Sequence, residues 1–138
     1  MGNLTANVSD YEFKCKCIDS NCYYKDDHVA DFRLVTALQK ITDHFKTNYK
    51  NEKVTLVITS GNRCCIYNAQ VGGKPYSKHT KGLAADFQIK IGDNVLSSYM
   101  IANYIATSIN LKIFDYYNID NNTIHLEVDK DWWELNSL

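Results

Sequence analysis

Two segments near the end of the chain can pair only as neighbouring antiparallel strands, and this constrains the fold more than any other feature. Residues 123–129 alternate, with every second side chain apolar. A period of two is typical of a strand with one buried face. Residues 112–118 are also rich in β-forming side chains, and only the polar turn 119–122 separates the two segments. The spacing predicts a β-hairpin.

Two other segments have the periodicity of helices. Apolar residues recur every three or four positions over residues 28–45, which predicts an amphipathic helix. A similar pattern over residues 96–109 predicts a second helix. The residues able to cap these helices are Asp26 or Asp27 for the first and Asp93 or Asn94 for the second.

Two more strands are predicted, over residues 53–59 and 84–91, where β-rich runs alternate in polarity. Residues 60–80 between them hold three glycines and the only proline, and we interpret them as a long functional loop. In the strand 84–91 the side chains divide into a core-facing set, Ala85, Phe87 and Ile89, and an opposite set, Asp86 and Gln88.

This order of elements predicts an α+β fold, a mainly antiparallel sheet with helices on one face. The 138 residues, 45% apolar and 22% charged, fit one small domain spanning 1–138. Residues 1–25 are polar and broken, and we expect a loop-rich arm that packs on this domain. The Trp132–Trp133 pair is expected to pack back against the sheet.

Charge and hydropathy exclude several partners. The net charge is -1, so we expect neither a nucleic-acid nor a membrane partner, and we expect a monomer. No run of 18 apolar residues predicts a membrane span. Residues 1–10 are polar and carry no apolar signal-peptide segment, so we expect the protein to be made in a cytoplasm.

Five cysteines leave two interpretations open. Their odd number argues against a complete set of disulfides. The spacing C-x-C-x4-C of the first three does not match the usual zinc-finger pairs, which favours reduced thiols in a loop. The alternative is a second, structural metal site that recruits one of the later two. The five are Cys15, Cys17, Cys22, Cys64 and Cys65.

Histidines and carboxylates supply candidate metal ligands. His79 ends the loop and Asp86 follows seven residues later, but a catalytic zinc needs three protein ligands and one open position. His28 and His44 are expected to be solvated helix residues. His125 lies in the last strand, and its side chain points to the same face as that of Glu127. This placement suits a metal ligand with a general base beside it. Taken alone, a single histidine on a strand is more often a hydrogen-bonded polar residue than a metal ligand.

Three motifs follow one another along the chain. Residues 58–63 read ITSGNR, residues 68–73 read NAQVGG, and residues 77–87 read SKHTKGLAADF. They resemble the signature of the VanY-type D-alanyl-D-alanine metallopeptidase family, which is S-G-x-R, then N-x-x-V-G-G, then S-x-H-x-x-G-x-A-x-D. The strand IHLEV at 124–128 is similar to its last motif, histidine, any residue, aspartate. The resemblance runs from about residue 13 to residue 129.

The resemblance implies a zinc ion with three protein ligands: His79, Asp86 and His125. For Arg63 it implies substrate binding or stabilisation of transition-state charge. Ser77 resembles the residue that bonds the substrate or orients the ligand loop. We expect Tyr76 to line the substrate cleft, and Tyr116 either to line it or to fill a core edge.

The general base departs from the family pattern. Several relatives carry it three residues before the last histidine, where this chain has Asn122, which cannot take a proton. Glu127 is the carboxylate nearest to His125 on the same strand face, and we expect it to be the base. Asp120 is the alternative.

The resemblance implies a zinc-dependent peptidase that cuts peptidoglycan stem peptides, as a phage or prophage endolysin. Such an enzyme is expected in the host bacterial cytoplasm before its release to the cell wall. Two bonds are open, L-alanyl-D-glutamate as an endopeptidase and terminal D-alanyl-D-alanine as a carboxypeptidase. A non-catalytic zinc-containing binding module of the same fold is the alternative, and a small metal-dependent amide hydrolase is a third. The presence of Arg63 and of a carboxylate beside His125 favours the enzyme.

Overall fold

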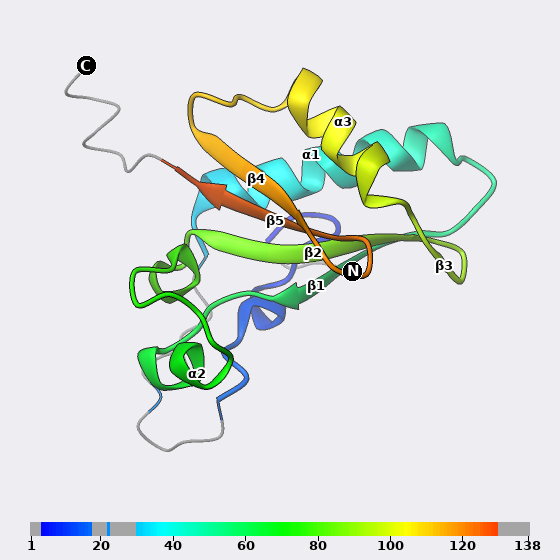
Figure 1. Cartoon of the computed structure of the whole chain (residues 1–138). Coiled ribbons are helices and arrows are strands. Elements are labelled where there is room, and N and C mark those ends of the chain that lie inside the picture. The colour runs from blue at the N-terminus through cyan, green and yellow to red at the C-terminus, as the bar shows by residue number, and fades with distance from the viewer. Residues whose placement is uncertain (1–3, 18–21, 23–29, 130–138) are drawn as a thin grey trace.

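The computed structural model describes residues 4–17, 22 and 30–129 (Figure 1). Predictions for His28, for Asp26 and Asp27 as caps, and for the Trp132–Trp133 pair lie outside these residues. The helices are η1 (Asp10–Phe13), α1 (Phe32–Asn48), α2 (Cys65–Gln70), η2 (Lys78–Lys81) and α3 (Ser98–Ser108). The strands are β1 (Val54–Ser60), β2 (Ala84–Ile91), β3 (Asn94–Val95), β4 (Phe114–Ile119) and β5 (Thr123–Val128).

The five strands form one antiparallel sheet in the order β1-β2-β5-β4, with β3 paired to β2. This confirms the α+β class and the β4–β5 hairpin, whose turn holds Asn121 and Asn122 at positive φ. The β1–β2 register shifts between Ile58 and Ser60, so β1 carries a bulge one residue before it ends opposite Asp86.

Both long helices, α1 and α3, cover the same face of the sheet, as Figure 1 shows. Ala85, Phe87 and Ile89 of β2 point into the core beneath them and are fully buried, as predicted. Burial of a side chain such as Phe87 stabilises the fold by roughly 1.5–3 kcal/mol. The opposite face of the sheet is therefore left for polar side chains. No helix among the described residues is both long and apolar enough to cross a membrane.

Both long helices begin later in the sequence than predicted. α1 begins at Phe32, and Asp31 caps it by accepting a hydrogen bond from the backbone N–H of Arg33. α3 is capped by Ser97, because Asn94 belongs to β3 and Gly92 at positive φ turns the chain between β2 and β3. Several residues in each segment can cap, so tertiary packing decides which one does.

The segment 60–80 was predicted as an irregular loop, but it contains α2 and the first three residues of η2. α2 has six residues, with Cys64 as its cap, and is too short to show helical periodicity. Figure 1 places it away from α1 and α3, at the end of the sheet where β1 ends and β2 begins.

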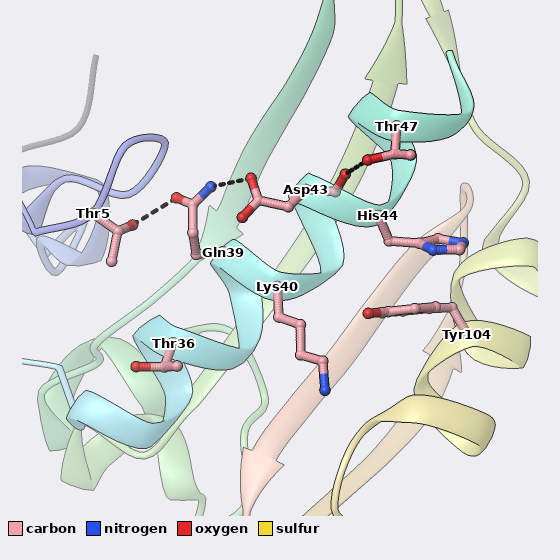
Figure 2. Close-up of a pocket in the computed structure, with 8 residues that line it drawn as sticks. All are labelled: Thr5, Thr36, Gln39, Lys40, Asp43, His44, Thr47 and Tyr104. Carbon is pink, nitrogen blue, oxygen red and sulfur yellow. Dashed lines mark hydrogen bonds between the residues drawn. The ribbon is translucent and has the colours of Figure 1, made fainter. Parts of the chain in front are cut away.

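Residues 4–17, the described stretch of the N-terminal arm, pack on the domain. Val8 and Phe13 are fully buried in the main core. Gln39 of α1 accepts a hydrogen bond from Thr5 and donates one to Asp43 (Figure 2). Figure 2 draws a pocket along α1 in which the ring of His44 stacks on Tyr104. His44 is therefore half-buried and not the solvated residue predicted.

The arm also touches the end of β1. A Cβ atom on Gly61 would lie 2.6 Å from Cα of Phe13, so only glycine allows this close approach. The backbone N–H of Asn62 donates to the carbonyl of Phe13 over 2.9 Å. The arm therefore sets the position of the chain just before Arg63.

Candidate metal centre

The polar face of the sheet brings Asp86 and His125 side by side. Asp86 lies in β2 on the face opposite the core residues, as its place in the alternation predicts. His125 lies directly across from it in β5, because these two residues are register partners in the β2–β5 ladder. Both are buried, at 8% and 3% exposure.

His79 reaches the same point from η2. Ser77 caps this turn by accepting a hydrogen bond from the backbone N–H of His79 over 3.3 Å. Gly82 ends it in the left-handed region, with φ 73°. Nδ1 of His79 lies 2.7 Å from the carbonyl oxygen of Gly61. The buried His79 ring is thus held between the end of β1 and the start of β2.

Three ligand atoms converge on one point. Nε2 of His79 lies 3.1 Å from Oδ1 of Asp86, and Nδ1 of His125 lies 2.7 Å from the same oxygen. The three atoms are within 4.8 Å of one another. The structure therefore brings together the three predicted ligands.

The donor set fits a zinc ion. The carbonyl of Gly61 can only accept, so Nδ1 of His79 carries its proton and a neutral ring leaves a bare Nε2 facing Asp86. Two lone pairs 3.1 Å apart repel unless a proton or a cation lies between them. Two imidazole nitrogens and one carboxylate oxygen are ordinary zinc ligands, and three of them leave one position open.

Asp86 and His125 shift each other's pKa in opposite directions. Burial alone would raise the pKa of Asp86, but its hydrogen bond with His125 and its interaction with His79 outweigh that effect and hold the pKa well below its usual range. Burial alone would lower the pKa of His125, yet its hydrogen bonds to Asp86 and Glu127 raise it to about 9. In the absence of metal, His125 is therefore cationic at neutral pH.

This charge predicts a pH-dependent stability of the metal-free protein. The pKa of His125 rises from 6.5 to about 9 on folding. Its charged form therefore stabilises the fold fully below about pH 6.5, and that stabilisation is lost as the pH rises through 9. We expect a loss of about 3 kcal/mol over this range. Urea unfolding of the wild type and of His125→Asn, in the presence of a chelator and at several pH values, measures this loss. An equal pH dependence of the free energy of unfolding in the two proteins would contradict the prediction.

Glu127 and Tyr117 contact the His125 ring on the sides that do not face Asp86. Oε1 of Glu127 lies 2.8 Å from Nε2 of His125, the nitrogen that faces away from Asp86. This hydrogen bond is the main cause that lowers the pKa of Glu127, so the carboxylate is ionised at neutral pH. The ring of Tyr117 stacks on the imidazole with a centroid distance of 4.4 Å. These contacts set the tautomer and orientation of His125.

Arg63 approaches the carboxylate of Asp86 from the opposite side. Nη2 of Arg63 lies 3.5 Å from Oδ2 of Asp86. Nε donates to the hydroxyl of Ser60 over 3.2 Å, and Nη1 donates to Oδ1 of Asn68 over 3.3 Å. The guanidinium is therefore fixed beside the ligands and half-buried in the cleft wall.

Asn68 explains why the motif NAQVGG belongs to this site. It is buried, its amide donates to the carbonyl of Lys74 over 2.7 Å, and its backbone carbonyl accepts from Gly73. A Cβ atom on Gly73 would lie 2.0 Å from Oδ1 of Asn68 and 3.0 Å from Nη1 of Arg63. Asn68 thus links the glycine loop to Arg63.

Replacing Gly73 by alanine should therefore displace Asn68 and loosen Arg63. We expect kcat/KM to fall about 10-fold to 100-fold, because misplacement of a positioning group by about 1 Å costs that much. Zinc content should stay unchanged. The matched control is Gly72→Ala, whose Cβ would meet nothing within 4 Å, although its φ of 75° adds local backbone strain. Equal activities of the two variants would contradict the steric explanation.

A cleft of about 570 Å³ opens above the three ligands. Of the predicted substrate-binding residues, Arg63, Ser77 and Tyr76 line it. Asp120 is exposed in the β4–β5 turn and is not among its lining residues, and Asn122 accepts a hydrogen bond from the backbone N–H of Ser98. The lining residues that sequence reasoning missed are Lys74, Lys78, Asp115, Tyr117 and Ile119.

Strand alternation separates the tyrosines of β4. Tyr116 packs against the core, in line with the core-edge alternative, while Tyr117 faces the cleft with Asp115. Asp115 lies opposite Glu127 in the β4–β5 ladder. The polarity of residues 112–118 does not show which of their side chains face the cleft. The register of the hairpin would have shown it, because it gives each residue's position relative to His125.

Comparison with known proteins agrees with this site. The model of the family described as peptidase M15 matches residues 6–127. The match spans the three ligands, the glycine loop and Glu127. No curated protein and no solved structure matches the chain.

Proposed function

Because the chain belongs to the peptidase M15 family, we propose that it hydrolyses peptide bonds in the stem peptides of bacterial peptidoglycan. One observation carries the proposal most directly. His79, Asp86 and His125 converge at the base of an open cleft, with Arg63 fixed beside them. A metal peptidase needs this combination of three ligands, an open side and a cation.

When bound, the zinc ion supplies Lewis-acid chemistry, polarising a carbonyl and lowering the pKa of water. The protein supplies proton transfer and orientation. Glu127 is ionised, lines the cleft and keeps one carboxylate oxygen beyond its bond to His125. We assign it the role of general base, taking a proton from water and returning it to the leaving amine.

Substrate recognition falls to the basic side of the cleft. Arg63 presents a planar guanidinium that can bind a carboxylate in bidentate fashion or stabilise a developing oxyanion. Lys74 and Lys78 line the same cleft. Stem peptides carry several carboxylates, so this cluster of three cations suits them. Tyr76, 71% exposed at the rim, offers an apolar surface for the peptide backbone.

Digestion of purified peptidoglycan with zinc-loaded protein tests the function. Mass spectrometry of the released muropeptides should show either cleavage between L-alanine and D-glutamate or loss of a terminal D-alanine. The control is Asp86→Ala, which removes a ligand and should release nothing. Wild-type protein that binds the wall but releases no peptide would contradict the proposal and identify a non-catalytic module.

The biological setting that we propose for this activity is that of a phage or prophage endolysin. Co-expression with a holin in a bacterial cytoplasm should then lyse the cells, and the Asp86→Ala variant should leave them intact. Lysis that is equal with both proteins would contradict this role.

A further inference from the structure

A second group of metal-ligating side chains lies between the N-terminal arm and the start of α2. The Sγ atoms of Cys15, Cys22 and Cys64 are within 4.8 Å of one another. All three residues are buried, at 2%, 7% and 0% exposure, in a small cluster separate from the main core. None of these three cysteines belongs to the His79–Asp86–His125 site.

A fourth thiol lies beside these three. Cys17 packs against it, and its side chain is a hydrogen-bond partner of Cys64. Cys65 is exposed, although it is the immediate neighbour of Cys64. All five cysteines are among the described residues and none forms a disulfide. The thiols therefore converge from two distant segments, the arm and the α2 cap.

Distances and hydrogen bonds both suit thiolates around a metal. Zinc–sulfur bonds of about 2.3 Å put the sulfurs of a tetrahedral site about 3.8 Å apart, whereas a disulfide needs about 2.05 Å. Sγ of Cys64 accepts from the backbone N–H of Tyr67 over 3.4 Å, and Sγ of Cys15 accepts from the backbone N–H of Cys64 over 3.3 Å. Such donors favour the charged form of sulfur.

The lowered pKa of Cys64 agrees with thiolates around a metal. Burial alone would raise the pKa of its thiol, but the Tyr67 N–H and the thiols of Cys17, Cys22 and Cys15 together lower it. A thiolate is the form that binds a metal, and a cation would neutralise several of them at once.

We propose that four cysteines bind a second, structural zinc ion: Cys15, Cys17, Cys22 and Cys64. Each thiol gives up its proton on binding, and four sulfurs close the coordination shell, so the site has no open position for catalysis. Its spacing differs from that of zinc fingers because one ligand comes from the loop after β1, 42 residues beyond Cys22.

The position of Cys64 links this site to the catalytic cleft. Cys64 directly follows Arg63, and the arm already contacts Gly61 and Asn62 through Phe13. A zinc ion between arm and loop would fix the backbone of Arg63 from behind the cleft. Its loss should lower the Tm by on the order of 5–10 °C and raise KM, while the catalytic metal is retained.

Cobalt substitution distinguishes the two sites. Protein produced with Co²⁺ under reducing conditions should show sulfur-to-cobalt charge-transfer absorption, to which the His79–Asp86–His125 site contributes nothing. His125→Ala and Cys65→Ser should keep this band, whereas Cys64→Ser and Cys17→Ser should each weaken it by at least the share of one thiolate in four. Because His125→Ala keeps the band, failure of the proposed peptidase function would leave this result intact.

Thiol protection provides a second measurement that does not depend on the folding of the variants. In zinc-loaded wild-type protein, alkylation should label Cys65 rapidly and the other four cysteines only after a chelator is added. Absence of the band in wild-type protein, its loss in Cys65→Ser, or equal labelling of all five thiols with zinc present would overturn the proposal.

Discussion

Replacing His125 by alanine is expected to remove one zinc equivalent and all detectable peptide hydrolysis. The variant loses the Nδ1 ligand that lies 2.7 Å from Asp86, so two protein ligands remain. Among the described residues, the Asp86 carboxylate then keeps His79 and Arg63 as its partners. Loss of the catalytic metal removes a rate enhancement of about 10⁶-fold or more.

Metal analysis and muropeptide release measure this result together. The matched control is His44→Ala, because His44 is half-buried on α1, stacks on Tyr104 and lies outside the cleft. That variant should keep both zinc and activity. If His125→Ala kept full activity while lacking the zinc equivalent, the assignment of the metal centre would be wrong.

Replacing Glu127 by glutamine is expected to lower kcat by about 10²-fold to 10⁴-fold while zinc remains bound. The amide oxygen of glutamine can still accept the hydrogen bond from Nε2 of His125, so the ligand keeps its orientation. The amide cannot take a proton from water. The acid limb of the kcat profile, which reports the ionisation of the base, should disappear with it.

Two carboxylates serve as controls for Glu127. Asp115 lies opposite it in the ladder and lines the same cleft, whereas Asp120 is exposed in the hairpin turn. Asp115→Asn and Asp120→Asn should each retain most of the kcat. If Glu127→Gln instead weakened zinc binding about 10-fold to 100-fold and excess zinc restored the rate, Glu127 would be a positioning residue for His125.

The faces of the strands could be predicted because the pleat enforces a period of two. Asp86 and Glu127 were placed opposite the core by alternation alone, and the structure confirms this for both. Their convergence could not be predicted in this way. Asp86 and His125 are 39 residues apart, and their pairing depends on the β2–β5 register, which many distant contacts determine together.

Other features had no local signal. Asn68 appeared as a motif position, but its bonds to Arg63 and Lys74 form only when the glycine loop folds over it. Likewise, the meeting of Cys64 with the arm depends on packing between segments far apart in sequence. Side-chain type suggested which residues do chemistry, while tertiary packing decided which of them meet.

The bulge in β1 makes this part of the chain intolerant of changes in length. A deletion between Ile58 and Ser60 would reverse the direction of the following peptide groups, so the carbonyl of Gly61 would no longer receive the Nδ1 proton of His79. The sheet could still form, yet it would lack a metal ligand. The exposed turn at residues 50–53, at the other end of β1, has no such role. Affinity tags, reporters and wall-binding modules should therefore be inserted there, because that turn is remote from the catalytic edge.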